Sequence, residues 1–235
     1  EVNVPQPVEL EGMHDCYVPL DPPYRKIIPI EKPEDLIGTP YIPCDLDKVA
    51  AIVPCDIPDK PSKLSAVDDD ARAMGQNLVD FFKAEVKAGR LPKNLLPLQS
   101  GVGSVANAVI NGLVNSDFED LTVFTEVIQD GMFDLIDAGK LRVASGASLT
   151  PSAPYMEKLY KNFDKYKKHL ILRPQQISNN PEVLRRLGVI AMNTAIECDI
   201  YGNINSSHIC GTNIMNGIGG SGDFARNGYL TVFFT

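Results

Sequence analysis

One glutamate of this sequence stands where parallel α/β folds place their chemistry. Glu126 lies one residue, Thr125, beyond the apolar run 121–124 (LTVF) and directly precedes the amphipathic run 127–138. The first run predicts a buried strand and the second a helix. Because open α/β sheets bind ligands at the carboxyl ends of their strands, we expect Glu126 in a crevice at that edge. The adjacent helix N-terminus would keep the carboxylate ionised as a nucleophile; a structural carboxylate that caps its helix is the alternative.

Two glycine-rich loops flank this glutamate in the sequence. Residues 100–103 (SGVG) lie between a predicted strand and a predicted helix, where a backbone can approach a ligand closely. This loop lacks the third glycine of a dinucleotide fingerprint and the lysine of a P-loop, so a tight strand–helix turn explains it equally well.

The second loop, residues 217–223 (GIGGSGD), is more specific, with four glycines among its first six residues. So many glycines cost conformational entropy, which is typical of a loop whose backbone amides face a substrate and stabilise an oxyanion. A flexible surface loop is the alternative. We interpret Asp223 as a cap of the following turn.

No other catalytic constellation rivals Glu126. The three histidines, His14, His169 and His208, are far apart in the sequence and form no pair with a serine or cysteine. A glutamate nucleophile suits acyl chemistry that passes through an anhydride and a thioester. It suits hydrolysis less well, because water must then be admitted.

Cysteine usage indicates free thiols in a reducing compartment. The chain has five cysteines, an odd number without C-x-x-C spacing: Cys16, Cys44, Cys55, Cys198 and Cys210. This pattern argues against both a disulfide framework and a structural zinc site.

Length and charge narrow the class of protein. A chain of 235 residues is long enough for one large α/β domain, and no apolar run approaches the ~20 residues that span a bilayer. The net charge of −8 argues against a general nucleic-acid surface but is compatible with a local basic site for a phosphorylated ligand. The first residues contain neither an initiator Met nor a signal-like apolar core, which suggests a segment of a longer protein.

The chain divides into two unequal parts. Twelve of the 18 prolines precede Ser62, so residues 1–48 predict an extended Pro-rich segment with turns at Pro22-Pro23 and at 38–40. Because such long loops are uncommon inside a domain, we interpret this segment as an interdomain linker. Residues 49–235 are then the catalytic domain, truncated at both ends.

Strands and helices alternate from residue 49 onwards. Apolar runs predict strands at 49–53, 95–98, 121–124, 141–144 and 170–172. A predicted helix follows each of these strands, because apolar residues recur there at helical spacing. The apolar faces are Met74, Leu78, Phe81 and Phe82; Val105, Val109 and Leu113; residues 127–138; Met156, Leu159, Tyr160 and Phe163; and residues 182–187, whose helix starts at Pro181. The alternation predicts an α/β fold with a mostly parallel open sheet covered by helices.

The last third of the chain departs from this alternation. Residues 196–201 and 204–210 are strand-like runs joined at Gly202-Asn203, which predicts a hairpin. Residues 229–234 predict a central strand, after which the sequence stops. A buried strand there suggests that the domain continues beyond it.

Four blocks of this sequence resemble the signatures of one enzyme family. The blocks are 98–109 (LQSGVGSVANAV), 125–130 (TEVIQD), 172–179 (LRPQQISN) and 216–224 (NGIGGSGDF). They are similar, in the same order and over nearly the whole chain, to those of the acetyl-CoA hydrolase/transferase family. These are class I CoA-transferases, among them succinyl-CoA:acetate and propionyl-CoA:succinate CoA-transferases.

The resemblance implies a fold and a domain arrangement. Family members have about twice this length and two related α/β domains with the CoA-transferase (NagB/RpiA-like) fold. The chain would therefore be the linker and most of the second, catalytic domain.

The resemblance also implies roles for individual residues. Glu126 would become a glutamyl-CoA thioester, with the backbone N–H groups of Val102 and Gly220 and the side-chain amide of Asn179 as oxyanion donors. The implied CoA-binding residues are Leu98, Gln99, Ser100, Gly101, Val102, Ile196, Asn216 and Gly220.

The sequence thus predicts a CoA-transferase that moves CoA between small carboxylates such as acetate, succinate and propionate. Coenzyme A would be a substrate, with no metal or redox cofactor and no nucleic-acid or membrane partner. A homodimer in the cytoplasm, or in mitochondria of a eukaryote, is implied. An acetyl-CoA hydrolase and a CoA-binding fragment without turnover are the alternatives.

Overall fold

A six-stranded sheet forms the centre of the molecule. The computed structural model describes residues 12–54 and 67–235. The strands lie in the order β12-β7-β1-β2-β4-β6, and every neighbouring pair is parallel. Their bounds are β1 Leu98–Ser100, β2 Leu121–Phe124, β4 Leu141–Gly146, β6 Leu170–Leu172, β7 Ile190–Thr194 and β12 Leu230–Phe234. The predicted parallel open sheet is confirmed.

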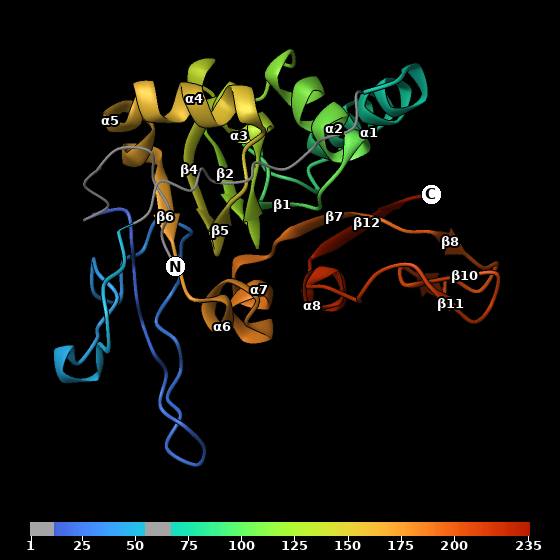
Figure 1. Cartoon of the computed structure of the whole chain (residues 1–235). Helices are drawn as coiled ribbons and strands as arrows, with labels where there is room; N and C mark the ends of the chain where they lie inside the picture. Colours follow the sequence, from blue (N-terminus) through green and yellow to red (C-terminus); the bar gives the residue numbers. More distant parts are fainter. Residues whose placement is uncertain (1–11, 55–66) are drawn as a thin grey trace.

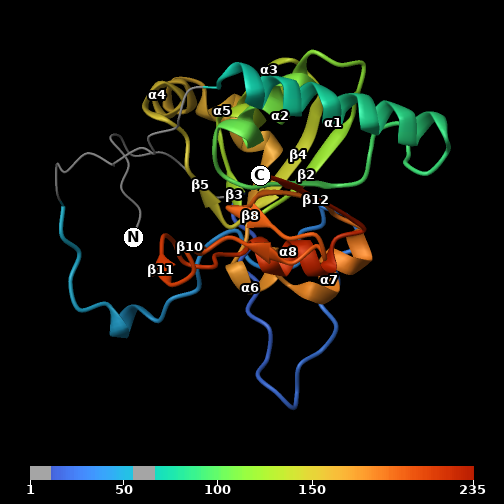
Figure 2. The ribbon, with the colours of Figure 1, turned by 90° about the vertical axis from the view of Figure 1, so that its right-hand side faces the viewer.

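Helices cover both faces of this sheet, as the two views in Figure 1 and Figure 2 show. One layer contains α1 Asp69–Lys87, α2 Ser104–Val114, α3 Asp130–Asp137, α4 Ala153–Lys161 and α5 Phe163–Tyr166. The opposite layer contains α6 Gln175–Ser178, α7 Pro181–Leu187 and α8 Ser221–Asn227. Two short 3₁₀ helices span Leu46–Lys48 (η1) and Lys167–His169 (η2). None of the helices in the described part combines the length and apolar composition that crossing a membrane requires.

Each face of the sheet has its own apolar core. Val123 of β2 packs into the larger core beneath the α1–α5 layer, whereas its neighbour Phe124 packs into the smaller core beneath α6–α8. Successive side chains of a strand point to opposite faces, so both faces of β2 are buried. This double burial explains why the strand is a continuous apolar run rather than an alternating one.

The chain changes direction between β1 and β7. After β1, the strands β2, β4 and β6 are added to one side; the chain then crosses to the other side for β7 and β12. A reversal of this kind leaves a crevice at the carboxyl ends of the two central strands. The topology therefore singles out the ends of β1 and β7 as a binding edge.

The proline-rich segment packs against strand β6 and the smaller core. A backbone bridge joins His14 to Leu172 of β6, and Ile28 and Ile30 are buried in the smaller core. The predicted turn at Pro22-Pro23 is confirmed. The boundary between residues 1–48 and 49–235 as linker and domain stays a prediction.

Three local predictions were wrong. Residues 49–53 form no strand and are exposed, because this short apolar run has no neighbouring strand to pair with. The strand predicted at 95–98 begins only at Leu98, since Pro97 has no N–H for a ladder hydrogen bond. The helix predicted from 127 begins at Asp130; Val127–Ile128 instead form β3, which pairs with β5 Ser148–Leu149.

The segment after β7 forms small hairpins. β8 Glu197–Cys198 and β9 Ile204–Asn205 are antiparallel and joined through Gly202 at φ +81°, which confirms the predicted hairpin. The second predicted run is broken, and β10 His208–Ile209 pairs instead with β11 Asn213–Ile214. The predicted central strand 229–234 is β12, which lies at one edge of the sheet in the described structure. The sequence prediction also missed β7.

Candidate active site

Glu126 lies at the carboxyl end of β2, as predicted. Its backbone oxygen accepts hydrogen bonds from Ala147 N–H and Ser148 N–H, so the β4–β5 connection holds it from one side. The side chain is half-buried. The predicted support from its own helix is wrong, because β3 separates Glu126 from α3, which begins at Asp130. A different helical segment, the start of α8, meets the carboxylate.

Both carboxylate oxygens of Glu126 accept a hydrogen bond from a side-chain amide. Gln175 Nε2 lies 3.2 Å from Oε1, and Asn179 Nδ2 lies 3.2 Å from Oε2. Gly220 packs so closely against this pair that a Cβ there would collide with Glu126 Oε2 and lie 2.5 Å from Asn179 Nδ2. A side chain at this position would therefore displace the Glu126 carboxylate and the Asn179 amide from this arrangement. The structure thus brings together three predicted site residues, Glu126, Asn179 and Gly220, from three separate segments.

The orientation of the Asn179 amide is set by two further contacts. Its Nδ2 also lies 3.4 Å from Asp223 Oδ2, and its Oδ1 accepts a hydrogen bond of 2.8 Å from Ser178 Oγ. Asn179 is buried, so water does not compete for these partners. The interpretation of Asp223 as a helix cap is wrong: Gly220 occupies the N-cap position of α8, and no side chain caps it. Asp223 instead lies within α8 and helps direct the amide protons of Asn179 towards Glu126.

A crevice of about 500 Å³ opens over Glu126 at the edge that the topology singled out. Its lining comes from the ends of β1, β2 and β7, from the hairpin segment and from the second glycine-rich loop: Gln99, Ser100, Gly101, Val102, Glu126, Val127, Asn193, Thr194, Ser206, Asn216, Gly217, Ile218, Gly219, Gly220 and Ser221. Six of the eight predicted CoA-binding residues are among them.

Leu98 and Ile196, the other two, do not line this crevice. Leu98 is fully buried in the larger core, because its side chain points into that face of the sheet. Ile196 donates its N–H to Asn205 O and belongs to the base of the hairpin. The roles of Leu98 and Ile196 in CoA binding stay predictions.

A buried polar network holds the strand ends beneath the crevice. The side-chain amides of Gln99 and Asn193 form two mutual hydrogen bonds, of 3.0 and 2.9 Å, between β1 and β7. Gln129 Nε2 donates to Gly101 O at 2.7 Å, and Thr125 Oγ1 to Ser100 O at 3.3 Å. The Gln99 and Asn193 amides satisfy each other, as buried polar groups usually do, whereas Gln129 Oε1 is buried without a hydrogen-bond partner in the described structure. They fix the loop after β1 relative to Glu126.

Sequence reasoning missed three of these functional positions. Gln175 lies inside the quoted block 172–179 but was given no role. Asn193 follows the apolar run 189–192, just as Glu126 follows 121–124, so the same signal was present for it. Gln129 carried no signal, because its contact with Gly101 joins residues that are distant in the sequence.

Two predicted backbone donors remain available at the crevice. Among the described residues, none accepts a hydrogen bond from the backbone N–H of Val102 or from that of Gly220. Both residues line the crevice. Unpaired backbone donors at a ligand-binding edge suit an anionic group or a developing oxyanion.

The histidines and cysteines lie away from this site. His169 contacts Arg142 O and His208 contacts Ser207 Oγ, and none of the three histidines lines the crevice. Cys16, Cys44, Cys198 and Cys210 are free thiols, as predicted, and Cys55 lies outside the described residues. Within residues 12–54 and 67–235, no group of His, Cys, Asp and Glu side chains is placed to hold a metal ion.

Sequence comparison finds similar proteins over the whole chain. Residues 156–232, which include Asn179 and Gly220, match the model of the acetyl-CoA hydrolase/transferase C-terminal domain. Over all 235 residues the chain is 53% identical to a succinyl-CoA:acetate CoA-transferase of Clostridium kluyveri and covers 44% of it. It is also 46% identical, over 235 residues, to an acetyl-CoA hydrolase of Yarrowia lipolytica and covers 45% of that protein. The chain thus spans less than half the length of these relatives.

Solved structures share the fold at lower identity. RipA from Yersinia pestis matches with a TM-score of 0.63 and 21% identity, over 81% of this chain and 41% of that one. A 4-hydroxybutyrate CoA-transferase from Porphyromonas gingivalis matches with a TM-score of 0.51 and 19% identity, over 74% of this chain and 41% of that one. The sheet and its helices therefore belong to a known fold.

Proposed function

This chain belongs to the acetyl-CoA hydrolase/transferase family, and we propose that it carries the catalytic centre of a CoA-transferase with Glu126 as the nucleophile. The supporting observation is the convergence of two amides and a glycine on one carboxylate at the floor of a crevice. A carboxylate held by donors on both oxygens is oriented before substrate arrives. Such preorganisation is what nucleophilic catalysis requires.

The proposed reaction alternates between two covalent states of Glu126. The carboxylate attacks the acyl-CoA carbonyl, the C–S bond breaks, and a mixed anhydride and the CoA thiolate form. The thiolate then attacks the Glu126 carbonyl, releasing the first carboxylate and leaving a glutamyl-CoA thioester. An acceptor carboxylate attacks this thioester and reverses both steps, so that CoA leaves on the acceptor. Acetate, succinate and propionate are the proposed carboxylates, and CoA is the only cofactor-like group involved.

Each attack produces an oxyanion that needs hydrogen-bond donors. Asn179 Nδ2 donates a hydrogen bond to Glu126 Oε2. We assign this donor to the oxyanion that forms when the carboxyl carbon of Glu126 is attacked. The free N–H groups of Val102 and Gly220 are proposed for the oxyanions of the two carbonyl centres. Preorganised donors of this kind typically contribute about 3 kcal/mol each.

Hydrolysis of acetyl-CoA is the second candidate, because several relatives carry the name acetyl-CoA hydrolase. The composition of the crevice favours transfer. Glu126 is the only ionisable side chain among its described lining residues. Once Glu126 carries an acyl or CoA group, no neighbouring base in that lining remains to activate water. A small carboxylate, already a nucleophile, needs no such base.

The domain roles follow from the same proposal. We assign residues 49–235 to the catalytic domain and 1–48 to a connecting segment of a longer enzyme. A homodimer remains part of this proposal.

A covalent adduct tests the nucleophile. The intact protein, incubated with acetyl-CoA, should gain the mass of CoA on the peptide that contains Glu126, and borohydride should trap it inactive. Glu126→Ala should abolish both adduct and turnover. Glu119→Ala is the matched control, because Glu119 is exposed and lies just before the amino end of β2, whereas Glu126 follows its carboxyl end. Turnover by Glu126→Ala near the wild-type rate would rule out the mechanism, and the alternative of binding without turnover predicts no adduct in either form.

The lifetime of the adduct separates transfer from hydrolysis. In buffer without a carboxylate, the glutamyl-CoA adduct of a transferase should persist for many turnover times, and acetate should discharge it rapidly. Decay in buffer alone at a rate that matches kcat, with no effect of acetate, would establish the hydrolase instead.

A further inference from the structure

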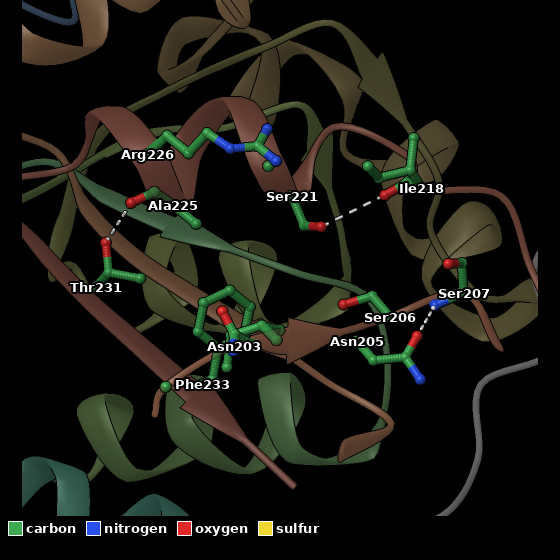
Figure 3. A pocket seen from close by; sticks show the side chains of 13 residues that line it. Asn203, Asn205, Ser206, Ser207, Ile218, Ser221, Ala225, Arg226, Thr231 and Phe233 are labelled. Atoms are coloured by element: carbon green, nitrogen blue, oxygen red, sulfur yellow. Dashed lines mark hydrogen bonds between the residues drawn. The ribbon is translucent and has the colours of Figure 1, made fainter. Parts of the chain in front are cut away.

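A second pocket adjoins the crevice over Glu126. Its volume is about 520 Å³, and it lies between the hairpin segment 202–207, helix α8 and strand β12 (Figure 3). Ser206, Ile218 and Ser221 line both the pocket and the crevice. The two spaces therefore meet at these shared residues, and one elongated ligand could occupy both.

Arg226 gives the second pocket its charge. It is the only ionisable side chain among the pocket's described lining residues, so no acidic group there offsets it. Its guanidinium rests over Gly222, where a Cβ would lie 2.8 Å from Nη1. Glycine at 222 thus leaves the space that the guanidinium occupies. Among the residues that the structure describes, none forms an ion pair or hydrogen bond with Arg226.

Most other polar groups around this pocket are already engaged. Asn203 Nδ2 donates to Asp199 Oδ2, Asn205 Oδ1 accepts from Ser207 N–H, and Thr231 Oγ1 donates to Ala225 O. Unlike these three side chains, Arg226 has all of its donors unused among the described residues. A planar guanidinium with free donors matches the oxygens of a phosphate group.

The remaining lining suits the organic part of a nucleotide. The aromatic ring of Phe233 and the side chains of Ile204 and Ile218 provide apolar surface. Figure 3 shows Phe233 across the pocket from Arg226. A positive group facing an aromatic surface, in a chain of net charge −8, marks a local site for an anionic ligand with a flat apolar part.

We propose that the Arg226 pocket binds the phosphate-bearing nucleotide end of the acyl-CoA whose thioester lies at Glu126. This inference rests on the proposed function, which places the thioester in the adjoining crevice. CoA carries its thiol and its phosphates at opposite ends of a long arm. The junction at Ser206, Ile218 and Ser221 is where that arm passes from one space to the other.

A comparison of two thioesters in the intact protein tests this assignment. Acetyl-CoA carries the nucleotide and its phosphates, whereas acetyl-pantetheine lacks them. Arg226→Gln should lower the ratio of kcat/KM for acetyl-CoA over acetyl-pantetheine by about 10- to 100-fold, mainly through KM, since a charge-assisted contact is lost. Arg226→Lys, which keeps the charge without the fork of donors, should fall between the two.

Arg185→Gln is the matched control. Arg185 is exposed on α7, has no ion pair in the described structure, and its substitution changes the net charge equally. The ratio should stay at the wild-type value in this variant. An Arg226→Gln ratio within twofold of wild type, or an equal fall in Arg185→Gln, would overturn the assignment.

Calorimetric binding measurements test the nucleotide pocket independently of the proposed mechanism. The affinity of the protein for CoA relative to pantetheine should fall in Arg226→Gln by the same factor, and this measurement needs no turnover. An absent Glu126 adduct with a changed affinity ratio would reject the mechanism alone. A normal adduct with an unchanged ratio would reject the nucleotide pocket alone.

Discussion

The two walls of the crevice are built differently. The strand-end wall consists of residues 99–102, 126–127 and 193–194, at the carboxyl ends of β1, β2 and β7, together with the supporting segment 173–179 after β6. The hairpin wall is the segment 196–219, of which Ser206 and residues 216–219 line the crevice. Gln99, Asn179 and Asn193 of the first wall are buried, whereas Ile214 of the second is 74% exposed.

Their hydrogen bonds differ in the same way. In the strand-end wall, Gln99 and Asn193 bond across 94 positions of the sequence, and Gln175 reaches Glu126 across 49. In the hairpin wall, side chains bond near neighbours: Asn203 and the backbone of Tyr201 bond to Asp199, which holds the pKa of that carboxyl below its ordinary value. The first wall depends on the whole fold and the second on local turns. The proposed nucleophile, Glu126, belongs to the first wall.

A buried ion pair is the part of the strand-end wall whose loss should cost most stability. Arg173, which begins the segment that carries Gln175 and Asn179, pairs with buried Asp15. Burial lowers the pKa of the Arg173 guanidinium, and the charges of Asp15 and Asp35 oppose that shift. Asp15→Ala leaves this buried cation without its partner, and should reduce the free energy of unfolding by about 3–5 kcal/mol.

Urea denaturation would measure this loss, with Asp21→Ala as control. Asp21 is an exposed acid of the same N-terminal segment, and its removal should change stability by less than about 0.5 kcal/mol. Equal stability of the two variants would show that the N-terminal segment does not support the wall.

The amide of Asn179 is expected to matter for rate more than for stability. Asn179→Ala should lower kcat by about 100- to 1,000-fold with little change in KM, because it removes a donor to the oxyanion. Steady-state kinetics of the intact protein would measure it. Asn115→Ala, which removes an exposed amide bonded to Asn111 O at the end of α2, should leave both constants unchanged. A change in KM alone would make Asn179 a ground-state contact.

One substitution made in each region gives the sharpest contrast between the two walls. Ile190→Ala in β7, which ends in the strand-end wall, removes a fully buried side chain and should cost about 2–5 kcal/mol. Ile214→Ala in the hairpin wall should change stability by less than about 0.5 kcal/mol. Thermal or urea unfolding of both variants would compare them. A loss above ~2 kcal/mol for Ile214→Ala would mean that this wall is covered in the intact protein.

The sequence alone determined the strands that are continuous apolar runs, such as 121–124 and 170–172, and the helices with clear spacing. It also placed Glu126 at a strand end and identified the glycine loop at 217–223. These features were predictable because they depend on residues close together in the chain. A strand that is buried on both faces is an unbroken apolar run, and the polar residues that follow the run mark the carboxyl end of the strand.

Only the tertiary structure decided what surrounds Glu126. Val127 and Ile128 pair with β5 instead of starting a helix, and Gln175 rather than α3 contacts the carboxylate. Asp223 contacts Asn179 where local reasoning placed a cap. Each of these outcomes joins residues at least 20 positions apart, and their free energy depends on packing that no local pattern records. Spacing along the chain could therefore identify the nucleophile candidate, whereas its hydrogen-bond partners follow only from the folded sheet.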